Sequence, residues 1–329
     1  MDLEPKVQWR RVVLIIGVLS VLGMWGMAMA GNPLLFVSQG SAFSTPEVLV
    51  LWVVLGVANI LFFLSFYGSK PDIFLLLVPI GVMINSVGSA AMAAFGLPFY
   101  MDTVGSMLVG IVGGPALGAL TAGLTSMMWG VYSPDVLPHV MAAIFATLIV
   151  SVAAKGKHLT TLERVMGTGA VAGLVAAGVS WLTVLMVLNG GSAIGAFSLM
   201  RFFELLHFSE PVALLLQSFI SDPIDKTFSL IVAALAVRFG PEAIRKIFTA
   251  RENELVLDLI LRRPCELDVE DAPAPSAPRR TGSAAAGKPM AASKSSPKLS
   301  SSKPGPAMRA PATPKPRLRT QPPEGKHRK

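Results

Sequence analysis

Three ionisable residues stand close together inside a long apolar run, in the segment SDPIDKTF. They are Asp222, Asp225 and Lys226, and their spacing places them on roughly one side of a helix. Ionised groups at the centre of a bilayer cost at least about 2.5–3.5 kcal/mol each, so they persist where they pair or line a wet cavity. Asp222 precedes Lys226 by four residues, the order that favours an ion pair along a helix. Asn85, on an earlier apolar segment, is the expected partner across the bundle.

Two interpretations of this charged cluster stay open. In the first, it is a buried ion pair that locks the last helix to the helix carrying Asn85. In the second, it lines the floor of a solute cavity or changes partner when another protein docks. An intramembrane aspartyl protease is not expected, because Asp222 and Asp225 share one helix and a protease needs carboxylates from two.

The sequence contains no pattern that indicates an enzyme. Its four histidines have no metal-ligand spacing, and the single cysteine, Cys265, permits no internal disulfide. Neither a phosphate-binding GxxxxGK[ST] loop nor a GxSxG motif is present. We therefore expect no catalytic residues, metal or cofactor on this chain, and any energy from ATP must come from a partner.

The composition is that of a polytopic helical membrane protein. The chain is 52% hydrophobic and only 15% charged, with a mean hydropathy of +0.60, whereas soluble domains carry about 25% charged residues. Apolar runs of about 20 residues, enough to cross a bilayer core of about 30 Å, recur along it. The continuous runs predict eight helical segments, at about 12–31, 48–67, 73–96, 103–113, 116–131, 137–154, 164–188 and 211–239.

The distribution of Lys and Arg orients these segments. Cytoplasmic loops of membrane proteins are enriched in Lys and Arg. Eight crossings place every basic cluster on the cytoplasmic side, with both termini inside, only if GGP at 113–115 divides two helices. The apolar stretch over 12–30 resembles a signal peptide but exceeds the usual length, so we expect an uncleaved helix.

The chain is predicted to have four parts. A strongly basic tail follows the last helix, with 13 Lys and Arg but one acid, Glu324, over 279–329. Its Ala, Pro, Ser and Lys content predicts disorder. Its positive charge on the cytoplasmic side suits weak attraction to anionic lipid, and no specific nucleic-acid binding is expected. The alternative is a tail that is simply solvated. The predicted parts are a helix pair at 1–70, a six-helix core at 71–240, an amphipathic cytoplasmic helix at 241–264 and the tail at 265–329.

Small residues recur four apart on the early core helices, a spacing that lets helices approach closely. They either pack helices within this chain or form a smooth face that docks a partner membrane protein. The residues of this small-residue face are Ala90, Ala94, Gly110, Gly114, Gly118 and Gly123.

Several of these residues give the chain a family resemblance. The segment with Asn85, Leu97-Pro98-Phe99, Asp102, Gly105-Ser106 and Gly114-Pro115 resembles the opening of substrate-binding S components of energy-coupling factor (ECF) transporters. The Asp225-Lys226 pair is similar to one in the closing helix of that family. The resemblance covers about 73–248, so the first two helices and the tail are additions to a six-helix core.

The resemblance implies an integral plasma-membrane protein of a bacterium that captures a vitamin-like or other micronutrient from outside. It further implies a transmembrane coupling subunit and two cytoplasmic ATPases as partners. The alternative hypothesis is a membrane ligand sensor or regulatory anchor that acts through its basic tail.

Candidate solute contacts follow from the expected topology, in which the loop around 97–102 lies outside. Aromatic rings stack on flat solutes and a few polar groups orient them, although outward aromatics also form interfacial belts. Asp102 has a second candidate role, as the cap of the helix beginning at Thr103. The candidates are Phe99, Tyr100, Asp102, Trp129, Tyr132, Trp181, Arg201, Glu204, His207 and Glu210.

Overall fold

The structure, a computed structural model, describes residues 5–30, 46–97, 99–186, 197–240 and 260–261. All of them lie in the first of two units, which spans Met1–Pro273. The predicted tail over 265–329 lies outside the described residues, as does the amphipathic helix over 241–264 apart from Ile260 and Leu261. Ile260 is buried, and the backbone N–H of Leu261 donates to the carbonyl of Leu159 (3.0 Å).

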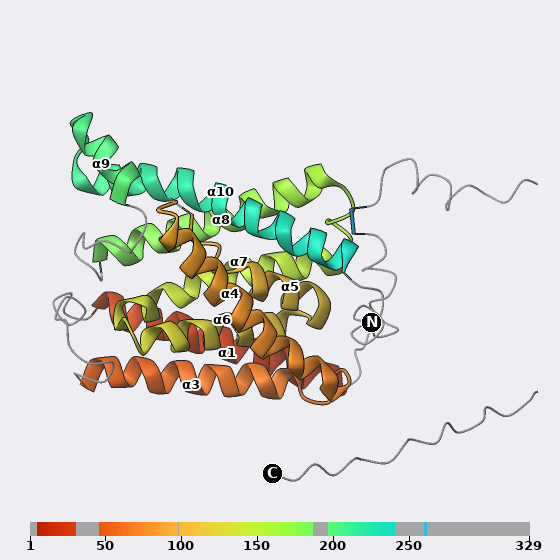
Figure 1. The fold of residues 1–329 in the computed structure, drawn as a ribbon. Coiled ribbons are helices and arrows are strands. Elements are labelled where there is room, and N and C mark those ends of the chain that lie inside the picture. Colours follow the sequence, from red (N-terminus) through yellow and green to blue (C-terminus); the bar gives the residue numbers. More distant parts are fainter. Residues whose placement is uncertain (1–4, 31–45, 98, 187–196, 241–259, 262–329) are drawn as a thin grey trace, which may run out of the picture. The chain divides into compact units, whose positions relative to one another are not determined.

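The described chain is all-helical, as predicted (Figure 1). Five of its helical stretches are long and apolar enough to cross a membrane. The bounds of the elements, in chain order, are α1 Pro5–Ala30, α3 Pro46–Phe66, η1 Asp72–Leu76, α4 Leu77–Ala94, α5 Val104–Gly113, α6 Pro115–Gly130, η2 Pro134–His139, α7 Val140–Lys155, α8 Leu162–Met186, α9 Phe197–Leu205 and α10 Glu210–Phe239.

The predicted break at GGP is confirmed. Gly114 has a φ of +96°, in the region that glycine adopts without strain, and ends α5. Pro115 then starts α6 at a position where its missing N–H costs nothing. With ten residues, α5 is about 15 Å long at 1.5 Å per residue, so it reaches only about half-way across a bilayer core.

Asn85 holds the beginning of α5 beside the middle of α4. Its side chain is fully buried, and its Oδ1 accepts from the backbone N–H groups of Gly105 (2.7 Å) and Ser106 (3.3 Å). Its Nδ2 donates to the hydroxyls of Ser106 (2.7 Å) and Thr125 on α6 (3.0 Å). The prediction that Asn85 is the partner of the charged cluster is therefore wrong, because the start of α5 uses its hydrogen-bonding capacity.

Glycines allow the closest helix contacts in the bundle. A Cβ on Gly105 would lie 2.0 Å from the carbonyl oxygen of Gly81, and one on Gly173 would lie 2.3 Å from the Cα of Pro223. The backbones of α4 and α5 therefore touch, as do those of α8 and α10 (Figure 1).

The small-residue face is mostly internal, which corrects the prediction of a docking surface for its four glycines. Gly110, Gly114, Gly118 and Gly123 are all buried. A Cβ on Gly118 would meet Thr147 of α7 at 2.6 Å, and one on Gly123 would meet Asn59 of α3 at 2.1 Å. These glycines pack helices within the chain. Ala90 and Ala94 are exposed on α4.

The first two helices pack on the core helices. Asn59 of α3 donates to the sulfur of Met127 on α6 (3.1 Å). Trp25 of α1 donates through Nε1 to the hydroxyl of Thr183 on α8 (2.8 Å). A boundary near residue 70 therefore does not separate two independent hydrophobic cores.

Candidate functional site

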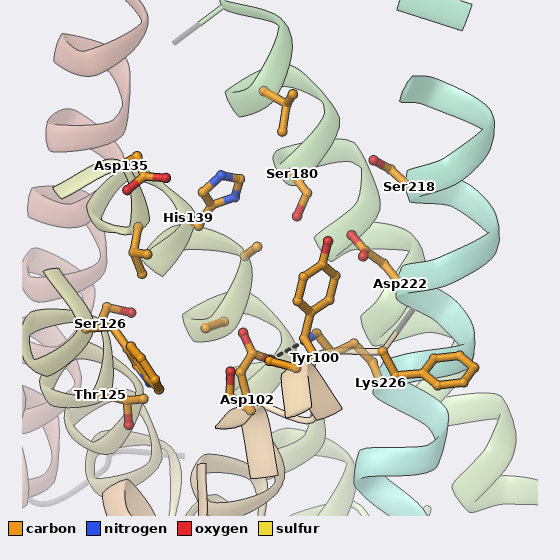
Figure 2. A pocket seen from close by; sticks show the side chains of 18 of the residues that line it. Tyr100, Asp102, Thr125, Ser126, Asp135, His139, Ser180, Ser218, Asp222 and Lys226 are labelled. Carbon is orange, nitrogen blue, oxygen red and sulfur yellow. Dashed lines mark hydrogen bonds and ion pairs between the residues drawn. The ribbon is translucent and has the colours of Figure 1, made fainter. Parts of the chain in front are cut away.

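A cavity of about 270 Å³ lies among α4, α6, η2, α7, α8 and α10. Figure 2 shows Asp135 and His139 on one side, Ser218 and Asp222 on the facing side, and Asp102 with Lys226 at one end. Apolar side chains and three aromatic residues, Phe99, Tyr100 and Trp129, complete the lining. This mixture of apolar walls and a few polar groups is typical of small-molecule sites.

The end of the cavity is closed by the segment between α4 and α5. This segment turns sharply at Gly96 (φ +64°) and again at Met101 (φ +44°), a strained value for a residue with a side chain. The second turn presents two consecutive backbone N–H groups, of Tyr100 and Met101, to Oδ1 of Asp225 (2.9 and 2.8 Å). A carboxylate on α10 thus fixes the segment that carries two of the aromatic lining residues.

Lys226 joins this segment to α10 by ion pairs. Its Nζ lies 2.7 Å from Oδ1 of Asp102 and 2.7 Å from Oδ2 of Asp225. Asp225 is fully buried, whereas 40% of the Asp102 side chain is exposed. Each oxygen of Asp225 therefore has a donor, which compensates for burial of its charge.

The prediction that Lys226 pairs with Asp222 is wrong, and so is one of the two candidate roles of Asp102, that of a helix cap. Lys226 pairs with its neighbour Asp225 and with Asp102, and the expected ion pair with Asp222 is absent from the described residues. Asp102 does not cap α5, because Thr103 occupies the N-cap position and no side chain caps that end. The loop brings Asp102 close enough to Lys226 to replace Asp222 as its second partner.

Four of the predicted solute contacts line the cavity, and the others do not. Phe99, Tyr100, Asp102 and Trp129 are lining residues, together with Asp222 and Lys226 of the charged cluster. Tyr132 is 80% exposed and packs edge-on against Trp129, with ring centroids 6.3 Å apart. The remaining candidates, none of them a lining residue, are Trp181, which donates to the carbonyl of Pro211 (3.1 Å), and the exposed Arg201, Glu204, His207 and Glu210.

The cavity also has polar lining residues that the sequence interpretation missed. They are Ser89, Thr125, Ser126, Asp135, His139, Ser180, Gln217 and Ser218. A usable signal existed on α10, where polar residues recur every three or four positions from Gln217 to Ser229 within an apolar helix. Such a stripe indicates a helix face turned toward a polar interior.

Comparisons with models of known protein families, with curated proteins and with solved structures found no match to this chain. The interpretation of the cavity therefore rests on its own residues and geometry.

Proposed function

We propose that this chain is a membrane-embedded solute-binding subunit of the S-component type, which captures a small molecule from outside the cell and delivers it to an ATP-driven coupling complex. The observation that carries the proposal is the cavity itself. It combines a small-molecule volume of about 270 Å³ with aromatic walls and a charged end. The resemblance of the α4–α6 segment and of Asp225-Lys226 to S components supports the same interpretation.

The position of the basic residues supports an outward-facing cavity. Lys70 donates to the carbonyl of Val112, at the end of α5 (2.7 Å), and the hydroxyl of Ser65 donates to the carbonyl of Arg10 (2.9 Å). These basic residues therefore share one end of the bundle, while Asp102, at the other end of α5, lines the cavity. By the positive-inside rule, the end with Lys70 faces the cytoplasm.

The fixed loop supports binding rather than catalysis. Asp225 and Lys226 use their charges on the 100–102 segment, which places Tyr100 and Phe99 at the cavity. In this proposal the charged cluster joins α10 to the loop before α5, instead of to the helix with Asn85, and contributes Lys226 and Asp222 to the cavity lining.

The test is to purify the tagged full-length protein from membranes under mild conditions and to identify its bound molecules and proteins by mass spectrometry. A small molecule together with a membrane coupling subunit and ATPases would support the proposal. A bound small molecule with signalling proteins instead would favour the sensor hypothesis. Absence of any small molecule, in a protein shown to be folded, would contradict solute binding.

A further inference from the structure

Four buried polar atoms of cavity-lining residues make no hydrogen bond in the structure. They are Nε1 of Trp129, Nε2 of His139, Oε1 of Gln217 and Oδ2 of Asp222. The Gln217 and Asp222 side chains belong to residues that are only 8% and 6% exposed. A buried polar group without a partner costs about 1–3 kcal/mol. Groups of this kind therefore indicate where the polar atoms of a ligand bind.

The charges around the cavity are unbalanced. Asp102, Asp135 and Asp222 all line it, while Lys226 is the one Lys or Arg among the described lining residues. Lys226 is already engaged by Asp102 and by Asp225 behind it. Within the described chain Asp222 therefore forms no ion pair. Its Oδ2 is buried and makes no hydrogen bond, so Asp222 offers a ligand a free acceptor oxygen.

The two residues with a free acceptor oxygen belong to one helix, and the Tyr100 ring lies beside one of them, Asp222 (Figure 2). Gln217 and Asp222 are both on α10, and Ser180 of α8 points into the same space as Asp222 (Figure 2). Tyr100 and Trp129 line the cavity, and aromatic rings attract cations as well as flat apolar groups. An anionic ligand would face three carboxylates and the Lys226 ammonium group, whose charge is already neutralised by its ion pairs. The charges of the lining therefore favour a cation.

We propose that the ligand is a small organic cation, with a protonated amine or amidinium group on a flat ring. Its N–H groups donate to Asp222 and Gln217, and its ring packs against the aromatic lining. This inference rests on the proposed solute-binding function and narrows it to one charge class of solute.

Three probes of the same size and shape test the charge class on the wild-type protein. Benzamidine is cationic, benzamide neutral and benzoate anionic, and each places one polar group on the same ring. Binding to the purified full-length protein in lipid nanodiscs is measured by tryptophan fluorescence and by the thermal midpoint of unfolding. We expect benzamidine to bind at least about tenfold more tightly than benzamide, because it forms a buried charge pair, and benzoate to bind more weakly than both.

Asp222→Asn tests whether Asp222 is the recognition group. The amide keeps the size of the side chain and removes its charge, so the preference for benzamidine over benzamide should fall to about twofold or less, while benzamide binds as before. Glu204→Gln, which removes an exposed carboxylate outside the cavity lining, is the matched control and should keep the wild-type preference. If Asp222→Asn does not fold, the wild-type probe series still decides the charge class.

The outcomes separate this inference from the proposed function. Equal binding of the three probes, or a preference for benzoate, overturns the charge inference and leaves solute binding intact. Where no probe binds, the charge of the molecule that co-purifies with the protein decides: a cation supports the inference, and an anion or neutral molecule overturns it. No probe binding and no co-purified molecule would overturn both.

Discussion

Lys226 of α10 and Asp102 of the α4–α5 connection form an ion pair, with Nζ and Oδ1 2.7 Å apart across 124 residues of sequence. Asp225 shares the same ammonium group and also accepts from the backbone of the connection. The cluster therefore fixes a strained segment of chain beside a cavity, and its members differ sharply in burial.

The difference in burial predicts unequal effects of removing the two partners of Lys226. Asp225→Ala leaves two backbone N–H groups without their acceptor and the buried Lys226 ammonium with only the partly exposed Asp102, so the free energy of unfolding should fall by about 3–5 kcal/mol. Asp102→Ala removes a carboxylate that is partly exposed, and the loss should be below about 1 kcal/mol. Thermal midpoints of the two purified variants in the same detergent measure the difference.

Asp225→Asn separates the two roles of this carboxylate. The amide keeps an oxygen for the N–H groups of Tyr100 and Met101 but loses the charge that faces Lys226. Its stability should therefore lie between those of wild type and Asp225→Ala. A variant as stable as wild type would show that hydrogen bonds to the loop, rather than the ion pair, carry the stabilisation.

Asn85→Ala should destabilise the bundle by about 1–3 kcal/mol or more, because it leaves buried N–H groups at the start of α5 without an acceptor. The neighbouring substitution Ser86→Ala is the matched control, since the Ser86 hydroxyl bonds mainly to the carbonyl of Val82 in its own helix (2.7 Å) and reaches α6 only through a longer contact with the sulfur of Met128 (3.7 Å). Thermal unfolding followed by circular dichroism compares them. Equal effects would contradict the role assigned to Asn85.

Two glycines on α8 give a prediction about helix packing. Gly173→Ala places a Cβ against the backbone of Pro223, and the forced separation of α8 and α10 should cost about 1–3 kcal/mol. Gly178→Ala meets nothing within 4 Å and should be neutral or stabilising by up to about 1 kcal/mol, since alanine favours helices. The midpoint of unfolding should fall below that of wild type for Gly173→Ala and stay equal or rise for Gly178→Ala. Equal midpoints of the two variants would contradict the close contact between α8 and α10.

The helices of this protein were largely predictable from the sequence, because apolar runs and the GGP break carry that information locally. Among the described α-helices, α9 was not predicted. It lies in the connection between the predicted segments 164–188 and 211–239, which was assigned only to a side of the membrane. Its residues Phe197–Leu205 are too few to give the length signal of a membrane span.

The site was less predictable than the helices, because it depends on which face of each helix turns inward. Choosing residues by their expected position along the membrane normal selected Trp181 and Tyr132, which are not among the cavity-lining residues. The pairing of Lys226 with Asp102 depends on a loop whose turn at Met101 has a positive φ. Spacing along a helix carries no information about such a loop. The i,i+4 spacing therefore predicted Asp222, and not Asp102, as the ion-pair partner of Lys226.

The docking of α1 on α8 gives the last prediction. Trp25 is half-buried and donates to the Thr183 hydroxyl, which in turn donates to the carbonyl of Val179. Trp25→Ala removes this bond and the contact area of the indole ring, and should lower the free energy of unfolding by about 1–3 kcal/mol. Trp9→Ala, at an exposed position on the same helix, should cost less than about 1 kcal/mol.

Unfolding midpoints give the size of both effects, and protease sensitivity of the α1–α3 connection reports whether α1 has left the bundle. If Trp25→Ala raised that sensitivity and left ligand binding unchanged, α1 would be a support outside the binding unit. Loss of binding at unchanged stability would mean that α1 shapes the cavity through Thr183, which lies one helical turn from the lining residue Ser180 and next to the lining residue Val184. If Trp25→Ala and Trp9→Ala gave equal effects, the docking of α1 through Trp25 would be contradicted.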